Sequence, residues 1–167
     1  SPLISLMKDQ VDGLETSGLR AVVINSTLTG RQMRLALESV EHDPPDLLYI
    51  APERLKSEEF IGLMNRLTVS FIAVDEAHCI AQWGHDFRPS YRKIGRFLEQ
   101  LDCRPPLAAF TATATAQVRQ EIIERLGLHN PSCHQSDFNR PNLQLDVFRD
   151  TDRQQWLTHA LRHGDVT

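Results

Sequence analysis

Two adjacent carboxylates, Asp75 and Glu76, directly follow the apolar run 71–74. Such a run is typical of a buried strand in an α/β sheet, and a strand of this kind presents the residues after it at the carboxyl edge, where ligands bind. Carboxylates at that edge can hold a metal ion. The pair therefore points to phosphate chemistry, with His78 two residues further along as another polar group.

The segment 79–89 places aromatic and charged side chains next to these acids. It mixes Trp83, His85, Phe87 and Arg88 without helical or strand periodicity. A run of this kind predicts a loop that contacts a ligand. The alternative is that Trp83 and Phe87 pack into the core beneath a long loop.

Helix and strand signals alternate along the chain and define the elements that must position these residues. Apolar residues at helical spacing predict helices over 3–14, 35–40, 58–67, 89–101, 118–126 and 152–163. Short β-prone runs predict strands at 20–24, 46–50, 69–74 and 107–111. Gly18 and Gly127 are suited to end the first and fifth helices. The alternation predicts an α/β fold with a doubly wound, mostly parallel sheet flanked by helices.

Size and composition fit one compact domain. The chain has 167 residues, 41% of them hydrophobic, and a net charge of -4, which argues against a protein whose whole surface binds nucleic acid. Cys79, Cys103 and Cys133 are widely spaced and favour neither a disulfide framework nor a zinc ribbon. No apolar run reaches the length of a membrane span. We expect a reducing compartment: the cytoplasm or nucleoid of a bacterium, or a eukaryotic nucleus.

Several motifs carry a resemblance to a known family. They are Ser-Pro-Leu-Ile-Ser-Leu-Met-Lys-Asp-Gln at 1–10, Tyr-Ile-Ala-Pro-Glu-Arg-Leu at 49–55, Asp-Glu-Ala-His at 75–78, the run 82–89, and Phe-Thr-Ala-Thr-Ala at 110–114. Residues 1–142 resemble the first, RecA-like motor domain of RecQ-type DNA helicases, which are DEAH-box members of superfamily 2. The aromatic-rich loop makes the resemblance specific. It implies ATP as the fuel and single-stranded and forked DNA as the partner, with an expected 3′ to 5′ polarity.

The resemblance also assigns roles at the nucleotide site. It implies that Asp75 holds Mg²⁺, through a bound water, and that Glu76 deprotonates the attacking water. His78 is expected to contact either the γ-phosphate or the run 111–113, and Thr111 and Thr113 to link hydrolysis to movement. The alternative for the two threonines is that they cap the following helix.

DNA contacts follow from the same resemblance. The aromatic-rich loop is expected to sense single-stranded DNA by stacking, through Trp83, His85, Phe87 and Arg88. Contacts to the backbone of the tracked strand are expected from Lys8, Asn25, Ser26 and Arg54.

The chain departs from the family pattern in one respect that bears on activity. No G-x-x-x-x-G-K-[S/T] phosphate loop occurs in it. We therefore expect a fragment: a partial first motor domain over 1–142, then a linker and the start of the second motor domain over 143–167. Such a fragment should be inactive alone and should need the rest of the helicase chain.

Two other function classes remain open. One is a metal-dependent hydrolase with Asp75, Glu76, His78 and His85 as ligands, although the spacing is not H-E-x-x-H and no pattern for a third ligand emerges. The other is a catalytically dead DNA-binding or scaffold domain with a RecA-like fold.

Overall fold

The computed structural model describes residues 4–81, 87–135, 142–143, 154–156 and 158, except for the side chains of residues 4–6 and 8–9. The chain divides into two compact units, Ser1–Pro131 and Ser132–Thr167. The division predicted at residue 142 stays a prediction. In the second unit, residues 154–156 are helical, and the rest of the helix predicted over 152–163 lies mostly outside the described residues.

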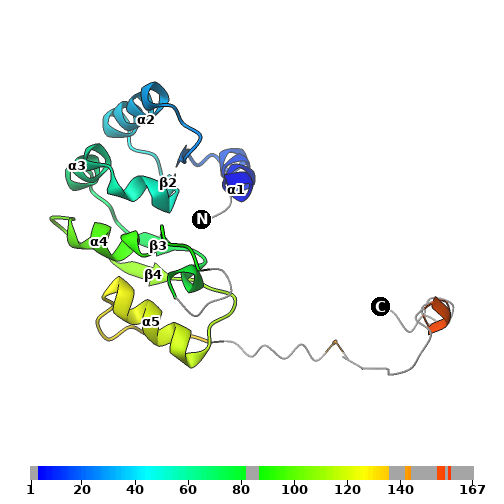
Figure 1. The fold of residues 1–167 in the computed structure, drawn as a ribbon. Coiled ribbons are helices and arrows are strands. Elements are labelled where there is room, and N and C mark those ends of the chain that lie inside the picture. Colours follow the sequence, from blue (N-terminus) through cyan, green and yellow to red (C-terminus); the bar gives the residue numbers. More distant parts are fainter. Residues whose placement is uncertain (1–3, 82–86, 136–141, 144–153, 157, 159–167) are drawn as a thin grey trace. The chain divides into compact units, whose positions relative to one another are not determined.

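Helices and strands alternate through the first unit, as predicted (Figure 1). The α-helices are α1 (Ile4–Thr16), α2 (Gly30–His42), α3 (Glu58–Arg66), α4 (Lys93–Glu99) and α5 (Ala116–Leu126). The strands are β1 (Ala21–Ile24), β2 (Leu47–Ile50), β3 (Ile72–Val74) and β4 (Leu107–Ala109). Two 3-10 segments, η1 (Pro52–Lys56) and η2 (Ala77–Ile80), follow β2 and β3. The α/β class is thereby confirmed.

The strands pair in parallel, but the described strands form two separate pairs. β1 pairs with β2, with Ala21 opposite Leu47, and β3 pairs with β4, with Ile72 opposite Leu107. β3 and β4 lie side by side in Figure 1. The parallel arrangement was predicted, whereas the division into two-stranded sheets was not.

β3 begins at Ile72, later than the start predicted at residue 69. Its first bond is from the Ile72 N–H to the carbonyl of Pro106, at 2.9 Å. Pro105 and Pro106 have no N–H to donate, so the ladder cannot continue upstream of Leu107.

A single hydrophobic core joins helices α2 to α5 with the strands and the two 3-10 segments. Phe60 of α3 stacks on Phe97 of α4, with ring centroids 5.7 Å apart. The side chains buried to less than 2% exposure include Phe60, Ile24, Leu63, Ile80, Leu98, Leu126 and Val40. The capped helix ends include the start of α2, where Thr29 and Gln32 form a capping box, and the end of α5, where Gly127 has the left-handed conformation, as predicted.

Helices α4 and α5 are in backbone contact at Gly95. A Cβ atom at this position would overlap the backbone carbonyl oxygen of Arg125. Backbone cannot move aside as a flexible side chain can, so we expect Gly95→Ala to destabilise the protein by about 1–3 kcal/mol. Chemical denaturation of the protein checks this.

Gly13→Ala in α1 is the matched control, because nothing lies within 4 Å of a Cβ at Gly13. Alanine also has the higher helix propensity, so this change should be neutral or slightly stabilising. Equal free energies of unfolding for the two variants would contradict the proposed close contact.

Candidate functional site

The Asp75–Glu76 pair follows β3 at its carboxyl end, as the sequence predicted. Glu76 has a left-handed backbone, with φ 49° and ψ 44°. This conformation is uncommon for a residue with a Cβ, and such strain persists only where surrounding contacts impose it. Three hydrogen bonds of 2.9 Å do so here: the Ala77 N–H donates to the Phe110 carbonyl, the Cys79 N–H to the Glu76 carbonyl, and the Glu76 N–H to Asp75 Oδ1.

The two carboxylates are placed differently. Asp75 is half-buried, and its Oδ1 accepts the Glu76 N–H, while its Oδ2 makes no hydrogen bond or ion pair with the described residues. The Glu76 side chain is 38% exposed, and its Oε2 lies 3.2 Å from His78 Nδ1. Asp75 therefore keeps one oxygen for a ligand, and Glu76 reaches solvent.

His78 connects Glu76 with the segment after β4. Its Nδ1 lies 3.0 Å from Thr111 Oγ1, and the Thr111 hydroxyl donates to the Thr113 carbonyl at 3.2 Å. Both contacts form together when the Thr111 hydroxyl gives its one hydrogen to that carbonyl and Oγ1 accepts from His78, which corresponds to the tautomer with a proton on Nδ1. The same N–H faces the Glu76 carboxylate. Of the two contacts expected for His78, the one with the run 111–113 is present.

The alternative role for the threonines is wrong. Helix α5 has Thr115 as its N-cap, and the Thr115 hydroxyl accepts the Val118 N–H. Neither Thr111 nor Thr113 caps that helix. Thr111 uses its hydroxyl in the His78 network, and Thr113 contributes its backbone carbonyl.

Of the aromatic-rich run 82–89, only residues 87–89 are described. Trp83 and His85 lie outside the described residues. Phe87 is half-buried, with the Arg92 guanidinium 5.6 Å from its ring centroid, a cation–π contact. The Arg88 N–H donates to the Cys79 carbonyl at 3.0 Å, which ties this end of the loop to η2.

Arg54 and Asn25 lie together, after β2 and β1. The Arg54 side chain donates from Nε to the Asn25 carbonyl and from Nη2 to the Leu28 carbonyl, each at 2.9 Å. Asn25 Oδ1 accepts the Thr27 N–H, and Ser26 is exposed. Arg54 thus supports the loop that carries Asn25 and Ser26, a role the sequence did not reveal. The side chain of Lys8 lies outside the described residues.

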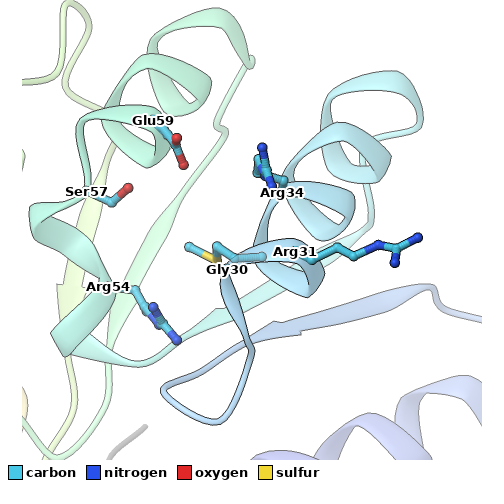
Figure 2. A pocket seen from close by; sticks show the side chains of 7 residues that line it. Gly30, Arg31, Arg34, Arg54, Ser57 and Glu59 are labelled. Atoms are coloured by element: carbon cyan, nitrogen blue, oxygen red, sulfur yellow. The ribbon is translucent and has the colours of Figure 1, made fainter.

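A pocket of about 380 Å³ lies beside Arg54 (Figure 2). Arg31 and Arg34 come to it from α2, and Ser57 and Glu59 from the start of α3. Neither α2 arginine is among the residues predicted from the sequence, although their i, i+3 spacing places them on one face of the helix.

Tyr91 is a further residue that the sequence analysis missed. Its ring is only 2% exposed, and its hydroxyl donates to the Asp75 carbonyl at 3.2 Å. Burial raises the pKa of Tyr91 above its ordinary value. No pattern in the sequence relates Tyr91 to Asp75, sixteen residues earlier.

Within the part of the chain that the structure describes, no three His, Cys, Asp or Glu side chains are grouped so as to hold a metal ion. His85, one ligand of the alternative metal site, is outside that part. None of the described helices is long and apolar enough to cross a membrane.

Comparison with known proteins identifies the family. The model of the DEAD/DEAH box helicase family matches residues 1–122. The chain belongs to this family. It is 43% identical over 164 residues to the ATP-dependent DNA helicase RecQ of Bacillus subtilis, covering 98% of this chain and 28% of that protein. It is 39% identical over 171 residues to the ATP-dependent helicase wrn-1 of Caenorhabditis elegans, covering 99% of this chain and 16% of that protein.

These relatives confirm the resemblance to RecQ-type helicases. The chain spans about a quarter of the length of the bacterial RecQ proteins that it matches. Among solved structures, the chain resembles Mycobacterium smegmatis helicase Lhr bound to ssDNA and AMP-PNP. The TM-score is 0.52 at 22% identity, over 74% of this chain and 17% of that one. This likeness supports the helicase motor fold.

Proposed function

We propose that the chain is part of the first motor domain of a RecQ-type, ATP-dependent DNA helicase, which couples ATP hydrolysis to translocation on single-stranded DNA and to duplex unwinding. One observation carries the proposal: the network from Glu76 through His78 to Thr111 joins the ends of two neighbouring parallel strands. Ligands of open α/β sheets bind at such an edge.

The residues at this edge fit a magnesium–nucleotide complex. Asp75 Oδ2 has no partner among the described groups and is a hard oxygen ligand, which suits Mg²⁺ held directly or through water. The metal, when bound, neutralises charge that builds up on the phosphates. The Glu76 side chain is 38% exposed and can accept the proton of an attacking water, and its carboxylate lies beside the His78 ring.

The chain alone does not supply a complete nucleotide site. It contains no phosphate loop of the G-x-x-x-x-G-K-[S/T] type, whose backbone would hold the triphosphate. We infer that the 167 residues hydrolyse ATP only within the full-length protein. The tests below therefore use that protein.

DNA would be held by two groups of residues. The loop with Asn25 and Ser26, held in place by Arg54, offers amide and hydroxyl groups for phosphates. The aromatic-rich loop offers rings for stacking, which is tolerant of sequence and suits a moving motor. Forked substrates, the 3′ to 5′ polarity, and residence in a bacterial nucleoid or a eukaryotic nucleus belong to the same proposal.

The proposal is tested with Trp83→Ala in the full-length protein. This change removes one stacked base contact, worth roughly 1–3 kcal/mol. The stimulation of ATP hydrolysis by single-stranded DNA should therefore fall about tenfold or more. ATP hydrolysis without DNA should change little, because the substituted ring is not one of the groups assigned to the nucleotide. The measurement is the ATPase rate against the concentration of single-stranded DNA.

Trp156→Ala is the control, since the chain has two tryptophans and Trp156 lies outside the family motifs. It should keep the full response to DNA. Equal losses of basal and stimulated ATPase in Trp83→Ala would indicate a packing role for Trp83 and contradict the proposal.

A further inference from the structure

We propose that Tyr91 is a positioning residue for Glu76: its hydroxyl holds the Asp75–Glu76 peptide in the orientation that gives Glu76 its left-handed backbone. The inference deepens the proposed function and rests on it, because it concerns the placement of the residue assigned as the base for water.

Both polar ends of one peptide are held. Its carbonyl oxygen, that of Asp75, accepts from the Tyr91 hydroxyl at 3.2 Å. Its N–H, that of Glu76, donates to Asp75 Oδ1 at 2.9 Å. Rotation of this peptide plane would change ψ of Asp75 and φ of Glu76 together, and it would break both hydrogen bonds.

The rotation has a driving force. Glu76 is one of two residues other than glycine with positive φ among those described, and a negative φ is the lower-energy state for a side chain with a Cβ. The cost of such a conformation is of the same order as the net value of one hydrogen bond. Loss of the Tyr91 hydrogen bond would therefore shift a measurable share of molecules to the rotated peptide. In that state the Glu76 side chain projects from the backbone in a different direction.

Tyr91 is well placed to impose this restraint. Its ring belongs to the hydrophobic core cluster together with Ile80 and Ile94, and its N–H donates to the Arg88 carbonyl at 2.9 Å. Because the core holds the ring and this hydrogen bond holds the backbone, the hydroxyl reaches the Asp75 carbonyl at little further entropic cost. Because burial raises the pKa of the phenol, the hydroxyl stays protonated and remains a donor at neutral pH.

Tyr91→Phe in the full-length protein tests the proposal, because phenylalanine fills the same space and lacks only the hydroxyl. We expect kcat for ATP hydrolysis to fall about threefold to tenfold, the effect of one hydrogen bond. The same factor should apply with and without DNA, and KM for ATP and the affinity for single-stranded DNA should stay at their original values. This pattern differs from that of Trp83→Ala, which removes the response to DNA.

Tyr49→Phe is the matched control. Tyr49 is the other tyrosine of the chain, sits half-buried in β2, and its hydroxyl has no partner among the described residues. It should keep the original kcat. An unchanged kcat in Tyr91→Phe, or a fall confined to the DNA-stimulated rate, would overturn the positioning role, whereas absence of ATPase in the unmodified full-length protein would overturn the proposed function itself.

Discussion

Glu76→Gln in the full-length protein is expected to lower ATP turnover by about 10²- to 10⁴-fold while leaving nucleotide affinity almost unchanged. Glutamine has the shape of glutamate and can still accept the His78 N–H through its Oε1, so the network to Thr111 is retained. What it lacks is the basicity needed to take a proton from water. The measurements are kcat for ATP hydrolysis and the affinity for a non-hydrolysable ATP analogue.

The left-handed backbone makes this variant informative. Both residues have a Cβ, so the strain at position 76 is the same in each and stability should not change. Glu38→Gln, an exposed change in α2 without an ion pair among the described residues, is the control and should keep full turnover. Unchanged ATPase in Glu76→Gln would exclude Glu76 as the base.

The double change Thr111→Ala and Thr113→Ala is expected to retain ATP hydrolysis and to lose most duplex unwinding. It removes the hydroxyl that joins His78 to the segment after β4, a pair of hydrogen bonds worth roughly 0.5–1.5 kcal/mol each. Unwinding per ATP hydrolysed should therefore fall about tenfold. ATPase and unwinding rates on the same DNA substrate give this ratio.

The structure separates the two threonines. Thr111 contributes its hydroxyl, but Thr113 contributes a backbone carbonyl that alanine keeps. Thr111→Ala alone should then reproduce most of the double change, and Thr113→Ala alone should have a small effect.

Thr115→Ala is the control for capping. It removes the hydroxyl that caps α5 and should destabilise the protein by about 1 kcal/mol without altering the ratio of unwinding to hydrolysis. If the double change lowers hydrolysis and unwinding by the same factor, the network serves catalysis and not coupling.

The order of the elements was accessible from the sequence because it depends on local patterns. The first five helix stripes and the four short β-prone runs each predicted an element that the first unit contains, and Gly127 ends α5 as expected. The errors lie at element ends. β3 starts late because Pro105 and Pro106 cannot donate to a longer ladder, a fact about the partner strand that β3 itself does not carry.

Taken by itself, the sequence determined the α/β class, the place of Asp75 and Glu76 after a strand, and the motifs that the helicase family shares. Only the tertiary structure decided that Tyr91 holds the Asp75 carbonyl and that Arg54 supports the Asn25 loop. Periodicity and turn chemistry act between near neighbours in the chain, and a sequence displays them directly. The contacts of Tyr91 and Arg54 join residues sixteen or more positions apart, and their existence depends on how the helices and strands pack.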